Sequence, residues 1–225
     1  MEEKNEKSKT WLIAGLIVWT ATVPLFSRAA ESPVKAFGII LTWLLFPLAY
    51  AIINKDFKGI GVTKENIRNA IWGMLVVSTV YSVIRNFLIV YVPSSSKYIA
   101  ASALTVAELL KQGYFGSIAG PFSKLFPIMF FITFLAAISN ELFYRGFLFT
   151  RLKQFVDWKT AVLICALLFG VYHYLNVGLS GFIMGVVVSI VSGWLMQRYN
   201  NVAAPALFHF LQYIITILVF YYDKL

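Results

Sequence analysis

Residues 137–149 read AISNELFYRGFLF, an apolar stretch with three polar side chains in its middle. Asn140, Glu141 and Arg145 lie there among Phe, Leu and Ile, in a segment whose composition is typical of a membrane helix. A charged side chain at the centre of a bilayer costs at least about 2.5 kcal/mol on insertion scales. These residues therefore need partners or a function, and the stretch predicts a membrane protein with a polar interior.

The composition of the whole chain agrees with this class. Of the 225 residues, 60% are hydrophobic and 13% are charged, and the mean hydropathy is +0.76. A soluble domain of this length cannot bury that much apolar surface, so we expect one integral membrane domain over residues 1–225. The net charge of +9 is spread over short connectors without a compact basic patch. We therefore expect membrane lipid as a partner and no nucleic acid.

Seven apolar runs are long enough, at about 20 residues each, to cross a bilayer. They cover residues 11–27, 36–53, 67–92, 125–150, 160–175, 178–197 and 202–222. Residues 1–10 are polar and predict a solvated tail, while residues 93–124 predict an interfacial helix or, as the alternative, an eighth short span. The expected fold is all-α, a polytopic membrane helical bundle of seven to eight transmembrane helices with a polar intramembrane cavity.

Lysine and arginine are distributed unequally between the two sides of such a bundle. With the N-terminus inside, eleven of these residues fall on inner connectors and six on outer connectors. This excess predicts a multi-pass protein of the cell membrane with a cytoplasmic N-terminus. In the sixth run, a face of small residues predicts close packing against another helix. Its members are Gly181, Gly185, Ser189 and Gly193.

Ionisable side chains at membrane depth are the candidates for function. Glu141 and Arg145 are four residues apart, so a helix allows them to form an ion pair, and a structural pair is one interpretation of both. Arg85 is expected near the outer end of its helix, with its charge extended to the membrane surface. Both histidines of the chain, His173 and His209, also lie in apolar runs.

The spacing around the histidines predicts a shared site. Three pairs of residues are four apart and therefore share a helix face, namely Phe169 with His173, His209 with Tyr213, and Asn140 with Tyr144. We expect three helices to present these pairs to a common interior. Two imidazoles that face each other can bind a metal, orient a water molecule or donate to an oxyanion.

These motifs resemble the type II CAAX prenyl endopeptidases and bacteriocin-processing or immunity proteins, known together as the CPBP intramembrane proteases. Members carry Glu-Glu-x-x-x-Arg, then Phe-x-x-x-His, then His-x-x-x-Asn or Asp on successive helices. The corresponding stretches here are NELFYR at 140–145, FGVYH at 169–173 and HFLQY at 209–213. The likeness covers about residues 125–222.

The resemblance implies an intramembrane endopeptidase that acts on membrane-associated peptides or on prenylated and otherwise lipidated proteins. It implies that a Glu at position 140 and His173 activate a water molecule, and that His209 and an Asn at position 213 stabilise the oxyanion. It also implies a divalent metal such as zinc, with His173 and His209 as candidate ligands, or no metal. Here Asn140 replaces the Glu and Tyr213 replaces the Asn, whereas Glu141, Arg145 and Phe169 match the motifs.

Two functional hypotheses follow from these departures. An amide at position 140 cannot accept a proton near neutral pH, whereas a general base contributes about 10²–10⁴-fold to a rate. Glu141 is expected to point about 100° away from Asn140 and to be held off the site by Arg145. The first hypothesis is an endopeptidase whose site is built on His173, His209 and Glu141. The alternative is an inactive pseudoprotease that binds a membrane peptide or partner, for example in bacteriocin self-immunity.

Overall fold

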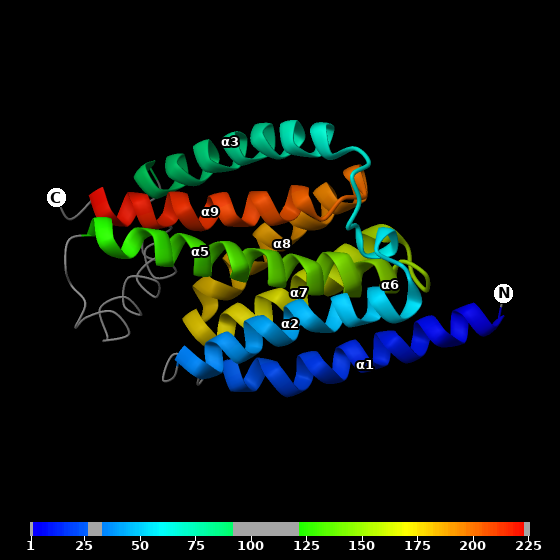
Figure 1. The fold of residues 1–225 in the computed structure, drawn as a ribbon. Coiled ribbons are helices and arrows are strands. Elements are labelled where there is room, and N and C mark those ends of the chain that lie inside the picture. Colours follow the sequence, from blue (N-terminus) through cyan, green and yellow to red (C-terminus); the bar gives the residue numbers. More distant parts are fainter. Residues whose placement is uncertain (1, 27–32, 92–121, 223–225) are drawn as a thin grey trace.

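The structure is a computed structural model that describes residues 2–26, 33–91 and 122–222 (Figure 1). All regular structure in these residues is helical, as predicted. The seven long helices of the described ranges are α1 (Glu2–Phe26), α2 (Pro33–Asn54), α3 (Ile67–Tyr91), α5 (Phe122–Glu141), α7 (Trp158–Val177), α8 (Leu179–Tyr199) and α9 (Ala203–Tyr222). The three short ones are the 3₁₀-helix η2 (Lys58–Ile60), the π-helix η4 (Leu142–Phe149) and α6 (Thr150–Leu152).

The seven apolar runs correspond to the seven long helices, with η4 extending the fourth. Residues 2–10, expected as a solvated tail, are the first turns of α1 because Glu and Lys are good helix formers, and residues 6, 7, 9 and 10 are exposed. The fifth run becomes a helix of 20 residues, separated from α8 only by Gly178, whose φ of 73° suits glycine. The interfacial helix or eighth span predicted for residues 93–124 lies outside the described part of the chain except for residues 122–124, which begin α5.

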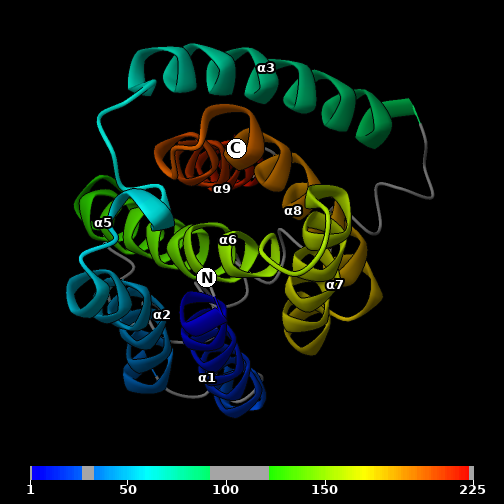
Figure 2. The same cartoon turned by 90° about the vertical axis from the view of Figure 1, so that its right-hand side faces the viewer.

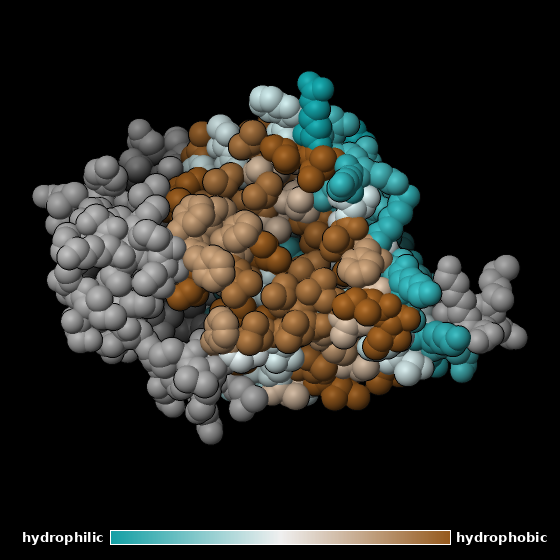
Figure 3. All heavy atoms as spheres, viewed as in Figure 1, coloured by the Kyte–Doolittle hydropathy of each residue, from teal (hydrophilic) through white to brown (hydrophobic). Residues whose placement is uncertain are grey.

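The outer surface of the bundle is apolar over a broad band. In the described residues, four helices are long and apolar enough to cross a membrane, over 37–54, 67–85, 158–175 and 179–199. Figure 3 shows a wide hydrophobic face bounded on one side by a hydrophilic rim. Large side chains such as Ile17, Ile53 and Val83 are more than 60% exposed on this surface. These features are consistent with a multi-pass membrane protein.

The helices alternate in direction, so their connections gather at two ends of the bundle (Figure 1). Connectors 55–66, 153–157 and 200–202 lie at the same end as the N-terminus, and we call this the basic end. It carries Lys55, Lys58, Lys64, Arg68, Arg151, Lys153, Lys159 and Arg198 in or beside these connectors. α3 ends and α5 begins at the opposite end of the bundle. This agrees with the count of lysines and arginines for seven spans, which places the segment between these two helices on the outer side. That the basic end is cytoplasmic stays a prediction.

The stretch 137–149 forms the centre of the bundle. Figure 2 shows α5, η4 and α6 as a middle rod, with α1 and α2 on one side, α7 and α8 on another, and α9 between the rod and α3. All eight residues of η4 are buried. A Cβ on Gly146 would lie 2.8 Å from the carbonyl oxygen of Ile60, so glycine allows the connector after α2 to pack directly on η4.

Small residues bring α7 and α8 together, as their spacing predicts. A Cβ on Gly193 would lie 2.9 Å from Val162 on α7, and one on Gly185 would lie 3.2 Å from Cβ and Cγ of His173. Ser189, in the same stripe, is 1% exposed. The stripe therefore lets α8 pack directly behind His173 and limits how that side chain can move.

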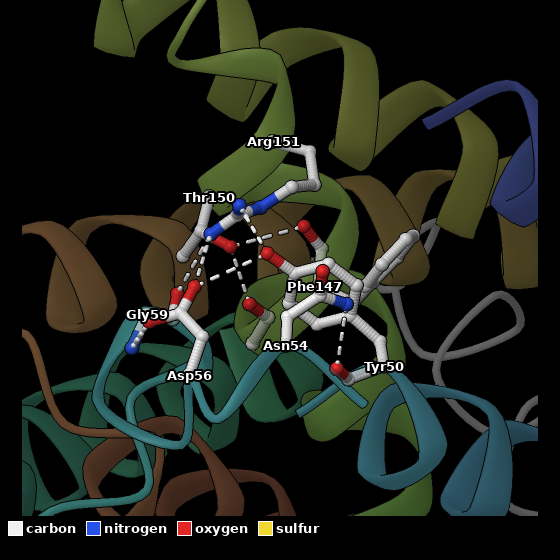
Figure 4. A network of polar contacts seen from close by, with 8 residues as sticks. Tyr50, Asn54, Asp56, Gly59, Phe147, Thr150 and Arg151 are labelled. Carbon is white, nitrogen blue, oxygen red and sulfur yellow. Dashed lines mark hydrogen bonds and ion pairs between the residues drawn. The ribbon is translucent and has the colours of Figure 1, made fainter. Parts of the chain in front are cut away.

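A polar cluster ties η4 and α6 to the connector at the basic end (Figure 4). Arg151 donates to the hydroxyl of Tyr50 at 2.6 Å and forms an ion pair with Asp56 at 3.4 Å. The other carboxylate oxygen of Asp56 accepts from the backbone N–H of Gly59 at 2.9 Å, and the carbonyl of Gly59 accepts from Arg151 at 3.4 Å. These contacts hold α6, at the end of the middle rod, against the connector 55–66.

Candidate active site

Glu141 is the last residue of α5, and its side chain is completely buried. Its Oε1 accepts a hydrogen bond from Arg145 at 3.1 Å and another from Nδ1 of His209 at 2.8 Å. The hydroxyl of Ser192 on α8 makes a longer contact of 3.5 Å with the same oxygen. One carboxylate therefore joins α5, η4, α8 and α9.

The expected pair between Glu141 and Arg145 is present, and aromatic rings surround its cationic partner. The guanidinium of Arg145 is fully buried and lies 4.9 Å from the ring centre of Phe169 and 5.7 Å from that of Tyr144. Both distances are within the range of a cation–π contact. The carboxylate and the two rings together stabilise a positive charge that would otherwise be costly at this depth.

His209 lies on α9, is 3% exposed and is held by its Nδ1 atom. A carboxylate only accepts hydrogen bonds, so the contact with Glu141 assigns the proton to Nδ1 and leaves Nε2 as the nitrogen available for chemistry. The ring stacks on Tyr213 at 4.6 Å and meets Phe169 edge-on at 5.5 Å. Its tautomer and its orientation are thus both set by its neighbours.

His173 lies on α7 and is held in the same way by a backbone carbonyl. Its Nδ1 is 3.0 Å from the carbonyl oxygen of Phe169. Because a carbonyl only accepts, Nδ1 of His173 carries the proton here too, and Nε2 keeps its lone pair. The ring contacts the side chains of Phe169 at 4.3 Å and Tyr172 at 4.7 Å and is partly exposed.

The two imidazoles converge as the spacing predicts. Both rings contact the ring of Phe169, which is itself fully buried. The structure thus brings two imidazoles, each held by Nδ1 and with Nε2 available as an acceptor, to the same aromatic side chain in the interior.

Asn140 and Tyr213, the two departures from the family motif, lie next to each other. Asn140 is 4% exposed, and its side chain hydrogen-bonds to the phenol of Tyr213. The amide N–H₂ donates to the phenol oxygen, so the O–H of Tyr213 can still donate to a further partner. The positions expected to carry a base and an oxyanion donor therefore form one hydrogen-bonded unit.

The expectation that Glu141 is held away from the site is wrong. Asn140 contacts Tyr213 while its neighbour Glu141 contacts His209, so two successive residues of α5 both reach α9. This is possible because α9 packs against the end of α5 and presents positions 209 and 213 one turn apart. Arg145 shares the carboxylate with His209 and does not compete for its position.

Two other expectations about this region are also wrong. The hydroxyl of Tyr144 does not face the site with Asn140, because it accepts from Nε1 of Trp19 at 2.7 Å, while the ring packs on Trp43 and on Phe169. The π-helix begins at Leu142, and its wider turn changes the direction of the side chains that follow. Arg85 is 7% exposed, so its side chain is buried and does not extend to the membrane surface.

The site does not have the donor set of a metal centre. In the described residues, no group of three or more His, Cys, Asp or Glu side chains is placed to hold a metal ion. A catalytic zinc site normally has three protein ligands. Among the described residues, the carboxylate beside the histidines is that of Glu141, which is shared by Arg145 and His209. In this part of the chain the expected zinc ligands His173 and His209 have no third ligand, and we derive no step through a metal.

Sequence reasoning missed two residues of the site. Ser192 contacts Glu141 from α8, and Tyr172 packs its ring against His173. Ser192 precedes Gly193 in the small-residue run, where its hydroxyl is not distinguishable from a packing residue. Tyr172 directly precedes His173 in the FGVYH stretch, but adjacent residues of a helix do not share a face, so their spacing does not predict a contact between the two rings.

Comparison with known protein families agrees with the motifs. Residues 122–215 match the family model described as type II CAAX prenyl endopeptidase Rce1-like. The matched range contains Asn140, Glu141, His173, His209 and Tyr213. The comparisons with curated proteins and with solved structures gave no match.

Proposed function

We propose that this chain is an intramembrane endopeptidase with a histidine base, because residues 122–215 match the family model of the type II CAAX prenyl endopeptidase Rce1-like proteins. Its substrates are membrane-associated peptides and prenylated or otherwise lipidated proteins. The observation that carries the proposal is the buried hydrogen bond between Glu141 and His209, beside the second imidazole of His173. A carboxylate that holds an imidazole by Nδ1 is a recurring arrangement for a general base.

In this proposal the Nε2 atoms of the two histidines have different roles. One water molecule has two O–H groups, and the Nε2 lone pairs of His173 and His209 can each accept one of them. His209 is the base, because Glu141 stabilises the imidazolium that forms when it takes the proton. His173 orients the water. Burial of Glu141 and His209 strengthens these interactions, since little solvent screens them.

The hydrolysis then proceeds in two steps. The water oxygen bonds to the peptide carbonyl carbon as its proton moves to Nε2 of His209, and the carbonyl oxygen becomes an oxyanion. The O–H of Tyr213 donates to this oxyanion, and Asn140 positions the phenol. The C–N bond then breaks, and the leaving amine takes the proton from His209. The products are a carboxylic acid, which keeps the second proton of the water and then releases it to solvent to become a carboxylate, and an amine; Glu141 stays ionised throughout.

The proposal is tested with purified protein in phosphatidylcholine vesicles that contain a farnesylated peptide. Cleavage is expected for the wild type and is expected to disappear in His173→Ala and His209→Ala. Tyr213→Phe removes one oxyanion donor and is expected to lower the rate about 10²-fold. Tyr174→Phe is the matched control, because Tyr174 is 52% exposed on the same helix as His173. Cleavage that survives His209→Ala would overturn the assignment of the base.

The pseudoprotease is the second candidate, and one observation favours it. Asn140 stands where the family motif has Glu, and an amide cannot act as the base. If the wild type is inert and Asn140→Glu cleaves, the chain is a binding protein on an intact protease scaffold. If the wild type already cleaves the peptide and Asn140→Glu only changes the rate of this cleavage, the result supports a histidine as the base.

A further inference from the structure

A second polar site opens at the basic end, away from the histidines. It is a pocket of about 420 Å³ between the start of α3 and the end of α8. Its walls include Asn66, Asn69, Trp72 and Val76 from the α3 side and Arg198 and Tyr199 from α8. None of these residues contacts Glu141, His173 or His209, so the pocket is separate from the candidate active site.

The lining of the pocket changes from polar to apolar along α3. A helix rises 1.5 Å per residue, so Asn66 and Val76 are about 15 Å apart along its axis. Asn66 precedes the candidate membrane span 67–85 and Asn69 lies in its first turn, whereas Trp72 and Val76 lie further along it. Trp72 is 62% exposed and Val76 is 61% exposed. This order matches a phospholipid, whose headgroup lies above its acyl chains.

The polar end of the pocket is suited to an anion. Arg198 supplies a guanidinium, and Asn66 and Asn69 supply amide donors. Among the described residues, Arg198 has no acidic partner within ion-pair distance, and the nearby Glu65 is paired with Lys58 at 2.9 Å. A guanidinium with flanking amides and no carboxylate is typical of a phosphate-binding group.

The floor of the pocket depends on one glycine. A Cβ on Gly73 would overlap the hydroxyl and the ring of Tyr199, so only glycine lets the phenol lie across the face of α3. This close approach joins α3 to the end of α8 at the pocket. The pocket is therefore formed by the backbone of α3 as well as by flexible side chains.

We propose that this pocket binds the phosphodiester headgroup of an anionic phospholipid from the leaflet at the basic end. Arg198, Asn66 and Asn69 contact the phosphate, and the acyl chains follow Trp72 and Val76 into the membrane. Trp72 lies at the level where aromatic rings concentrate at membrane surfaces. The proposal does not depend on peptidase activity, since no catalytic residue takes part.

Native mass spectrometry of the purified full chain with defined lipids tests this proposal. Phosphatidylglycerol and phosphatidylcholine are titrated separately, and the dissociation constant of the first bound lipid is measured. We expect clear preference for phosphatidylglycerol and a loss of about tenfold in its affinity for Arg198→Gln, with recovery in Arg198→Lys. Asn69→Leu removes a donor without changing charge and is expected to weaken binding about threefold or more.

Arg68→Gln is the matched control, because Arg68 is an exposed arginine at the same end that does not line the pocket. Its removal is expected to change the affinity by less than about fivefold, the effect of one surface charge. If Arg68→Gln and Arg198→Gln lower the affinity for phosphatidylglycerol equally, or if Asn69→Leu leaves it unchanged, the lipid is held by general attraction to the charged surface. Either result would overturn the proposed pocket. Displacement of the lipid by excess inorganic phosphate would instead assign the site to a soluble anion and overturn the lipid proposal.

Discussion

His209 donates from Nδ1 to Oε1 of Glu141 over 2.8 Å, and this hydrogen bond joins α9 to the end of α5 in the interior of the bundle. The same oxygen accepts from Arg145 at 3.1 Å. One buried carboxylate thus orients an imidazole and balances a guanidinium. Stability and the proposed chemistry therefore depend on the same atom, and variants at Glu141 affect both.

Glu141→Gln tests the structural part of this dependence. The amide keeps the size of the side chain but leaves the buried Arg145 without its negative partner. Loss of one member of a buried ion pair costs about 3–5 kcal/mol, so we expect a large fall in the thermal midpoint measured in detergent. Glu65→Gln is the control, because Glu65 pairs with Lys58 on the surface and such pairs contribute about 0–1 kcal/mol. Equal midpoints for the two variants would contradict this account of the interior.

Gly185→Ala tests whether α8 holds His173 in place. The added Cβ would lie 3.2 Å from Cβ and Cγ of His173, so the imidazole must shift by a few tenths of an ångström. We expect peptide cleavage to fall about tenfold or more while the helical content stays unchanged, because catalytic positions tolerate little displacement. The control is Gly38→Ala, where a Cβ would meet nothing within 4 Å. Full activity in Gly185→Ala would show that His173 has more freedom than the packing implies.

Arg151→Gln tests the cluster at the basic end. Arg151 contacts Tyr50, Asp56 and the carbonyl of Gly59, and its loss removes hydrogen bonds that involve a charged group, worth roughly 2 kcal/mol. The amide of Gly59 is expected to exchange hydrogen about tenfold faster or more, because opening of the connector becomes easier. The exposed Lys159, changed to Gln, should leave this exchange unaltered. Unchanged exchange in Arg151→Gln would mean that Asp56 alone holds the connector.

We expect Asp157, the N-cap residue of α7, to make the thermal stability of the protein depend on pH. Hydrogen bonds from the side chain and backbone of Thr160, with a further one from the backbone of Lys159, hold the pKa of the Asp157 carboxyl below its ordinary value. A carboxyl whose pKa is lower in the folded state stabilises the protein above its ordinary pKa and loses that contribution as the pH falls through the folded value. The thermal midpoint of the wild type should therefore exceed that of Asp157→Ala at neutral pH, and the difference should shrink below about pH 4.

Asp157→Asn is the control for this titration. Asparagine accepts the same N-cap hydrogen bonds but carries no charge, so its advantage over Asp157→Ala should not vary with pH. A pH-independent difference between the wild type and Asp157→Ala would show that the charge of this carboxylate contributes nothing to the helix start.

The helix positions and the local ion pair are the features that sequence could predict. The length of each apolar run reflects the thickness of a bilayer, and the spacing of Glu141 and Arg145 places both on one turn whatever surrounds them. Close packing of α7 on α8 follows from the glycines for the same local reason. These predictions need no knowledge of which helices are neighbours.

The rest of the site depends on contacts between helices. That Glu141 reaches His209 and Asn140 reaches Tyr213 follows from the position of α9 against the end of α5, which leaves no local pattern in either segment. The π-helix from Leu142 to Phe149 also has no spacing signal, and it turns Tyr144 toward Trp19. The contribution of Ser192 is hidden for a similar reason, because small residues in α8 are equally compatible with packing alone.

The central claim, hydrolysis by water with His209 as the base, is tested most directly by isotope incorporation. The wild type and His209→Gln are incubated with a farnesylated peptide in vesicles prepared in H₂¹⁸O, and the products are weighed by mass spectrometry. The account predicts that wild-type product carries one ¹⁸O atom in its new carboxylate and that His209→Gln forms none of this product. An intact peptide with the wild type, or labelled product at an equal rate with His209→Gln, would contradict it.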